Sequence, residues 1–175
     1  FPTIDGGRGG QLPTLTNNQA ISNVGKQGWD AGGAVFSRLE GIAIHDDVIY
    51  FTATQGGGEP EVVDWVNSAE SRNGFGRGFG QVWAYHPKRE LLEVVHQSAG
   101  TDDVHLPDNV TVSANGTLIL GEDNSPPPGD NNQLQALTAR GQVITIAEHL
   151  ERPGVEWAGA TFSPGGATIY ENVNT

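Results

Sequence analysis

Short runs of alternating apolar residues, each bounded by turn-forming residues, recur along the chain. Residues 39–51 contain two such runs joined by Asp46-Asp47, and this pattern predicts a β-hairpin with a tight turn. Residues 107–120 and 158–170 repeat the pattern, and Asn115-Gly116 in the first of them predicts a type I′ turn. We therefore expect three hairpins of one kind.

A second unit lies between these hairpins. Residues 80–87 resemble residues 132–139 at a spacing of 52 positions, and each leads into a further apolar run, at 91–96 and 142–147. Two hairpins in a period of about 50 residues make four strands, which is the content of one propeller blade. The sequence therefore predicts an all-β fold, a partial β-propeller of about three four-stranded blades.

The hairpins repeat at unequal intervals. Aligning Gly41 with Asn109 and Gly159 gives intervals of 68 and 50 residues, and a Gly-rich insertion at 55–79 explains the longer one. Residues 1–31 have no clear periodicity, so we expect an irregular lead-in there. The chain is predicted to be one domain over 1–175 and a fragment of a larger propeller, because propellers have four to eight blades.

The composition supports an all-β fold and argues against nucleic acid as a binding partner. Gly 25 and Pro 10 fit an all-β chain with many loops, and the absence of Met in a chain that begins with Phe1 suggests that residues precede it. The net charge of −12 would repel nucleic acid and attract divalent cations, although solubility alone is an equal explanation. No cysteine is present, and no apolar run approaches the roughly 18 residues of a membrane span.

Acidic residues stand where the first strand of each predicted blade begins. First strands line the central channel of a propeller, so these carboxylates should converge on the axis. Their neighbours are small or apolar, and burying a carboxylate there is costly without a cation or an arginine partner. Calcium takes six to eight oxygen ligands, and six residues are candidates for that role: Glu40, Asp108, Asn109, Glu122, Asp123 and Glu156.

Six short motifs follow one another along the chain. They are Arg-Leu-Glu-Gly-Ile at 38–42, Val-Ile-Tyr-Phe-Thr-Ala-Thr at 48–54, Gly-Gln-Val-Trp at 80–83, Pro-Asp-Asn at 107–109, Gly-Glu-Asp at 121–123 and Glu-Trp-Ala-Gly-Ala-Thr-Phe-Ser-Pro at 156–164. In this order they resemble the C-terminal half of PhoX-type alkaline phosphatases, over roughly residues 29–174. Each motif is weak alone, whereas their order and spacing are fairly specific.

The resemblance implies a bacterial propeller outside the cytoplasm, periplasmic or secreted, that is exported by the twin-arginine route. It implies hydrolysis of phosphomonoesters with Ca2+ and Fe3+ bound along the axis, where Glu40 and Glu156 would be metal ligands. Asp108 and Glu122-Asp123 would fall at or near the same site. Arg152, which closely precedes Glu156, would contact a phosphate oxygen. The iron-binding cysteine of the family would lie on missing blades.

Two other functions fit a propeller with acidic residues on its axis. One is a calcium-dependent lactonase, and the other is a non-catalytic propeller that binds calcium or a partner. Lactonases of this type hold one cation with few ligands, so several separate acidic motifs favour a site for more than one metal ion. The phosphatase is the first hypothesis, and the fragment alone is expected to be inactive.

Overall fold

The structure is a computed structural model that describes residues 28, 31–34, 36–57, 78–123, 132–150 and 155–174. Its regular elements are strands and one short 3-10 turn at Pro87–Arg89. The strands are β1 (Leu39–His45), β2 (Val48–Ala53), β3 (Gln81–His86), β4 (Leu91–Gln97), β5 (Pro107–Val112), β6 (Leu118–Glu122), β7 (Gln133–Leu137), β8 (Val143–Glu148), β9 (Glu156–Phe162) and β10 (Ile169–Asn174).

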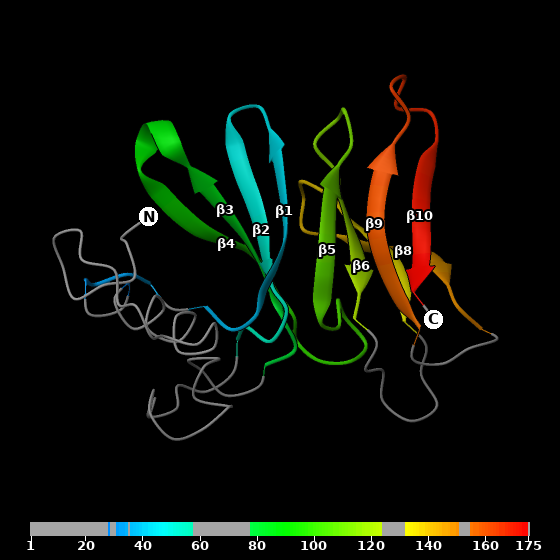
Figure 1. The fold of residues 1–175 in the computed structure, drawn as a ribbon, viewed down its shortest axis with the longest axis horizontal. Coiled ribbons are helices and arrows are strands. Elements are labelled where there is room, and N and C mark those ends of the chain that lie inside the picture. Colours follow the sequence, from blue (N-terminus) through cyan, green and yellow to red (C-terminus); the bar gives the residue numbers. More distant parts are fainter. Residues whose placement is uncertain are drawn as a thin grey trace, which may run out of the picture.

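The strands form three antiparallel sheets in chain order. The first sheet is β1-β2-β3-β4, the second is β5-β6-β7-β8 and the third is the pair β9-β10 (Figure 1). None of the sheets is closed, and the prediction of an all-β, partial propeller is confirmed. The first sheet is here called blade 1, the second is blade 2, and the pair β9-β10 gives the two described strands of blade 3.

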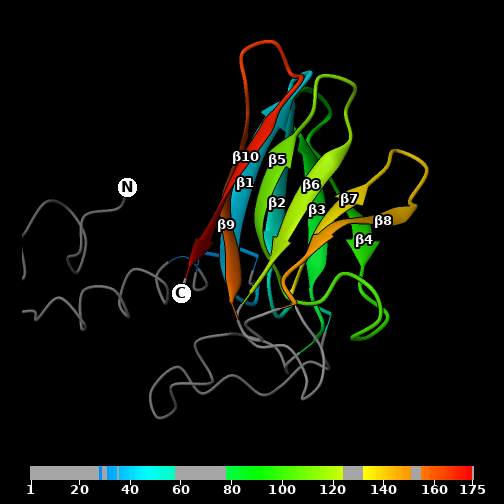
Figure 2. The same cartoon turned by 90° about the vertical axis from the view of Figure 1, so that its right-hand side faces the viewer.

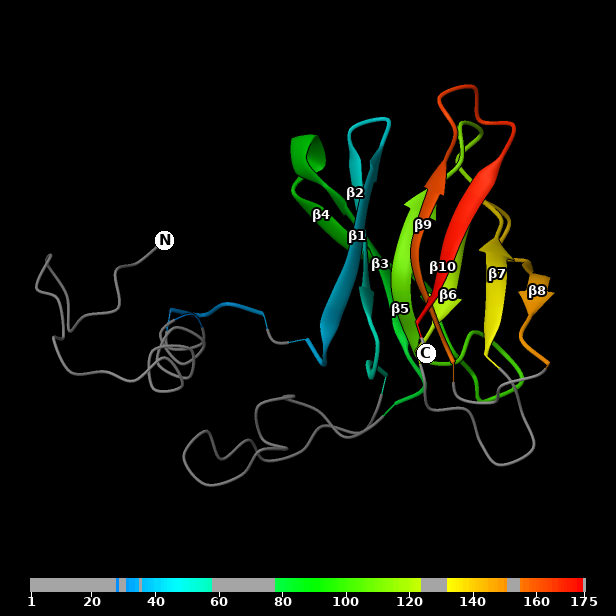
Figure 3. The same ribbon diagram turned by 45° about the vertical axis from the view of Figure 1, so that its right-hand side comes forward.

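The first strands of the three blades lie next to one another. Figures 1 and 3 show β5 between β1 and β9, and Figure 2 shows the full blades extending from this inner row toward β4 and β8. Two glycines allow the close approach. A Cβ on Gly41 would lie 2.7 Å from the Asp108 carbonyl oxygen, and one on Gly121 would lie 2.6 Å from the Trp157 carbonyl oxygen.

The core consists of the side chains between successive blades. Alternation along β6 sends Leu118 and Leu120 toward blade 1 and Ile119 toward blade 3, so that this strand is buried on both faces. Between blades 1 and 2, the buried cluster contains Val82, Val104, Val110, Leu118, Leu120 and Leu137. Between blades 2 and 3, it contains Ile119, Leu134 and Ala136, against which Trp157, Phe162 and Ile169 pack.

Of the two hairpin turns predicted from turn residues, Asp46-Asp47 has the expected conformation and Asn115-Gly116 does not. Asp46 and Asp47 have φ values of 47° and 63°, as a type I′ turn requires. The type I′ prediction for Asn115-Gly116 is wrong, because only Gly116 is left-handed, with φ of 82°. Ser113 N–H donates to the Thr117 carbonyl, which leaves three loop residues, and in such loops only the last adopts the left-handed conformation.

The predicted lead-in and insertion lie mostly outside the described residues. The described ends of the insertion meet, since Gly78 N–H donates to Gln55 O and Gly80 N–H donates to Gly56 O, both at 3.0 Å. The insertion therefore leaves and rejoins blade 1 at one place, between the end of β2 and the start of β3. The starts of β1, β5 and β9 lie at this same end, which we call the acidic end (Figure 1).

Candidate metal centre

Each inner strand has a β-bulge near the acidic end. The pairing register shifts between Leu39 and Ile42 in β1, between Pro107 and Asn109 in β5, and opposite Glu171 in β9-β10. The three bulges fall within one residue of Gly41, Asn109 and Gly159, which the alignment of the sequence repeats made equivalent. A bulge interrupts the alternation of side chains and redirects them. The bulges in β1 and β5 lie at the candidate ligands Glu40 and Asp108.

A left-handed residue precedes each of the first two bulges. Arg38 has φ of 53° and Leu106 has φ of 47°, and the two positions are equivalent in the repeat. Such a conformation costs a non-glycine residue on the order of 1 kcal/mol, and it is found where surrounding contacts enforce it. Here the carbonyl of Arg38 accepts from Thr54 N–H at 2.8 Å, and that of Leu106 accepts from Asp123 N–H at 3.0 Å.

Arg38 lies at the centre of the acidic cluster. Its Nη1 is 2.8 Å from Asp123 Oδ2 and its Nη2 is 3.4 Å from Glu40 Oε1. Asp123 belongs to blade 2, so the guanidinium joins two blades. Sequence reasoning assigned no role to Arg38, although it stands two residues before a candidate ligand, because the left-handed backbone that directs its side chain has no sequence signature.

The pKa of Asp108 is affected by the neighbouring carboxylates. Partial burial, together with the negative charges of Glu40, Asp123 and Glu156, raises its pKa to about 6, and Arg38 offsets only part of this effect. Three of the predicted ligands, drawn from three blades, therefore lie close enough to act on the fourth, Asp108.

Asn109 connects blade 2 to blade 3 within this cluster. Its Nδ2 donates to the Asp108 carboxylate and also lies 3.4 Å from the Trp157 carbonyl oxygen. Its Oδ1 accepts from Gly159 N–H at 3.4 Å. The amide thus orients the Asp108 carboxylate and ties β5 to the β9 bulge.

Glu122 is placed differently from its neighbour Asp123. Its side chain is buried, and its Oε1 and Oε2 accept from the backbone N–H groups of His105 and Gln133, each at 2.8 Å. These bonds satisfy one backbone donor just before β5 and one at the first residue of β7. A metal-ligating role for Glu122 stays a prediction. Arg152, predicted to contact phosphate, lies outside the described residues.

The donor set of the cluster suits a hard cation. Carboxylate, amide and carbonyl oxygens are the ligands that Ca2+ prefers, and a cation would offset the burial and the neighbouring negative charges that raise the pKa of Asp108. Within the described ranges, no three His, Asp or Glu side chains converge closely enough to hold an ion by themselves. Calcium would therefore need further oxygen ligands besides these carboxylates.

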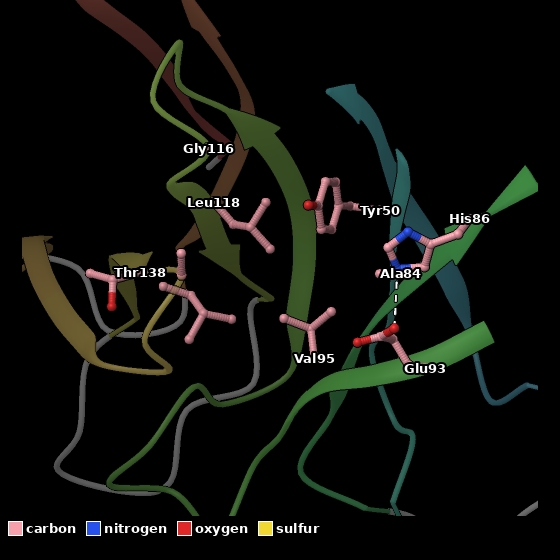
Figure 4. Close-up of a pocket in the computed structure, with 10 residues that line it drawn as sticks. Tyr50, Ala84, His86, Glu93, Val95, Gly116, Leu118 and Thr138 are labelled. Carbon is pink, nitrogen blue, oxygen red and sulfur yellow. Dashed lines mark ion pairs between the residues drawn. The ribbon is translucent and has the colours of Figure 1, made fainter. Parts of the chain in front are cut away.

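A separate cavity of about 190 Å³ lies between blades 1 and 2 at the other end of the strands (Figure 4). Tyr50, Val95 and Leu118 line it, and His86 Nε2 lies 3.1 Å from Glu93 Oε2 at its edge. The cavity is formed where β3 and β7 end, whereas the acidic cluster is formed where β1, β5 and β9 begin. The cavity is therefore no part of the candidate metal centre.

Comparison with known proteins points to one family. The family model described as alkaline phosphatase PhoX matches residues 10–175. The search of curated proteins finds no match to the chain. In the part of the chain that the structure describes, no helix has the length and apolar character needed to cross a membrane.

Proposed function

The chain belongs to the PhoX family of alkaline phosphatases, and we propose that it carries part of a metal-dependent site that releases inorganic phosphate from phosphate monoesters. The observation that supports this proposal is the cluster at the acidic end. There, the Arg38 guanidinium bridges carboxylates of blades 1 and 2, and partial burial together with the negative charges of Glu40, Asp123 and Glu156 raises the pKa of Asp108 to about 6.

The carboxylates would hold the metal ions. Glu40, Asp108, Asp123 and Glu156 would contribute ligands for Ca2+, and Asn109 would orient Asp108 through its amide. We propose Fe3+ as a second metal on the family resemblance alone. Bound cations would polarise the phosphoryl group and lower the pKa of an oxygen nucleophile.

Arg38 would neutralise charge on the phosphate. Burial acts to lower the pKa of this guanidinium, but the hydrogen bond and charge of Asp123 outweigh burial and raise it, so the group stays protonated. A guanidinium held by two carboxylates at a metal centre is suited to bind a phosphate oxygen as well. Arg152 stays a second candidate for this contact.

The open sheets support a role for further blades. A propeller closes its ring of blades so that no blade face is left uncovered, and here the described blades contact one another in succession, from blade 1 to blade 2 to blade 3. We propose that further blades supply the ligands that the described carboxylates lack. We also propose a location outside the cytoplasm, which rests on the family resemblance.

Metal analysis combined with an activity assay tests the proposed function. Mass spectrometry should find calcium and iron in the full-length protein that carries the further blades, and its hydrolysis of p-nitrophenyl phosphate should stop with a chelator and return with calcium. Glu156→Gln should lose nearly all turnover. Asp46→Asn, a matched loss of one carboxylate at the β1-β2 turn, should retain it.

The same preparations distinguish the alternative functions. Hydrolysis of a sugar lactone without phosphatase activity would favour a lactonase. Calcium binding without either activity would favour a non-catalytic propeller. Absence of iron together with absence of phosphatase activity in the presence of calcium would contradict the proposal.

A further inference from the structure

Two buried threonines at the end of β2 face the next blade. Thr52 is the penultimate residue of β2 and Thr54 follows the strand directly, and both are 0% exposed. A buried hydroxyl is stable only when it is hydrogen-bonded, so the partners of these two groups show what they hold in place.

The hydroxyl of Thr52 joins the bulges of two blades. Its Oγ1 accepts from Gly41 N–H at 2.8 Å and donates to the Asp108 carbonyl at 2.9 Å. Gly41 follows the candidate ligand Glu40 in β1, and Asp108 is itself a candidate ligand in β5. A threonine hydroxyl has a single proton to donate, and here that proton is used on the Asp108 carbonyl.

Thr54 makes a second connection of the same kind. Its hydroxyl donates to the Pro107 carbonyl at 3.0 Å, and its backbone N–H donates to the carbonyl of the left-handed Arg38 at 2.8 Å. One residue therefore fixes the backbone on both sides of the cluster, at Arg38 in blade 1 and immediately before Asp108 in blade 2.

Blade 2 shows that the fold does not require these hydroxyls. The register places Gly121 and Asp123 of blade 2 at the positions of Thr52 and Thr54. The N–H group of Asp123 repeats the backbone bond of Thr54, since it donates to the carbonyl of the left-handed Leu106 at 3.0 Å. The bulge in β5 forms although Gly121 has no side chain to hold it. The threonines thus add a connection between blades that strand pairing does not demand.

We propose that Thr52 and Thr54 are positioning residues, which set the distance between the Arg38–Glu40 segment and the Asp108 carboxylate and thereby the calcium affinity of the site. This inference rests on the proposed metal-binding function. Groups that orient metal ligands without touching the metal affect its affinity by about 10- to 100-fold when they are removed.

Calcium titration calorimetry on the full-length protein that carries the further blades tests the proposal. Thr52→Val keeps the shape of the side chain and removes the link between Gly41 and Asp108, so calcium affinity should fall about tenfold. Thr52→Ser restores the hydroxyl and should bring the affinity back to within about threefold of the wild-type value. Thr54→Val removes one hydrogen bond only and provides a milder variant should Thr52→Val fail to fold. The calcium affinity of the Thr54→Val variant should also fall.

A variant that is destabilised elsewhere in the fold separates positioning from general destabilisation. Leu137→Ala removes a buried side chain at the end of β7, where its strand partners are Leu118 and Val143, and it should leave calcium affinity unchanged. Tight calcium binding by the wild type that neither valine variant weakens would overturn the positioning role and leave the proposed function intact. A wild-type protein that binds no calcium would overturn both.

Discussion

At the scale of single residues, two glutamates on the second strands of their sheets behave differently. Glu122 has both carboxylate oxygens hydrogen-bonded to backbone amides. Glu171 of β10 lies opposite the β9 bulge, and both of its oxygens are shielded from solvent without a hydrogen-bond partner among the described residues. Partial burial accordingly raises the pKa of Glu171 to about 7. The ionised form of Glu171 is therefore unfavourable in the folded protein.

Glu171→Gln should stabilise the protein at pH 8 and not at pH 5. The pKa of Glu171 is higher in the folded state than in the unfolded state, so the carboxyl group favours folding at acidic pH and this advantage is lost as the pH rises through about 7. The amide cannot ionise, and we expect a gain of about 1 kcal/mol at pH 8, allowing for solvent around a half-buried side chain.

Urea unfolding of both proteins at the two pH values measures this difference. Glu90→Gln, at an exposed position in the turn before β4, is the control and should change little at either pH. A Glu171→Gln variant that is less stable than wild type at pH 8 would show that the carboxylate has a partner in the folded protein.

At the scale of elements, the bulged inner strands depend on close contact between blades. A Cβ on Gly41 would lie 2.7 Å from both Asp108 O and Val110 N, and these are backbone atoms that cannot rotate away. Gly41→Ala should therefore destabilise the protein by about 2 kcal/mol through overpacking. Denaturant unfolding measures the loss. Gly100→Ala adds a Cβ that meets nothing within 4 Å and should stay within about 0.5 kcal/mol of wild type; equal effects would contradict the prediction.

The hairpins were predictable from sequence, because alternation and turn residues are local signals. Asp46-Asp47 and the apolar runs on either side of it correspond to β1 and β2 almost residue for residue. The gathering of Glu40 and Asp108 could be predicted from the repeat. The bulges that direct them could not, since bulges follow from contacts between strands distant in sequence. For the same reason, sequence reasoning missed Arg38, whose backbone conformation depends on Thr54.

At the scale of the whole molecule, one face of blade 1 is apolar and uncovered by blade 2. Residues opposite one another in antiparallel strands share a face, and two such rows cross this sheet. The first row is Ile42, Phe51, Trp83 and Val94. The second row is Ile44, Ile49, Tyr85 and Leu92. Ile42 and Ile44 are 67% and 70% exposed, and contiguous apolar patches of this kind are typical of interfaces.

This face should make the 175-residue chain associate with itself in solution. Burying it would remove apolar side chains from water, and sedimentation velocity should show a weight-average mass that rises with concentration. Changing both Ile42 and Ile44 to Lys should shift the chain toward monomer without lowering its stability, because neither side chain packs in the core between blades. Leu150→Lys alters a side chain that is 72% exposed and lies outside the strands, so association should persist. A wild-type chain that stays monomeric at every concentration and unfolds cooperatively would show that this face needs no partner.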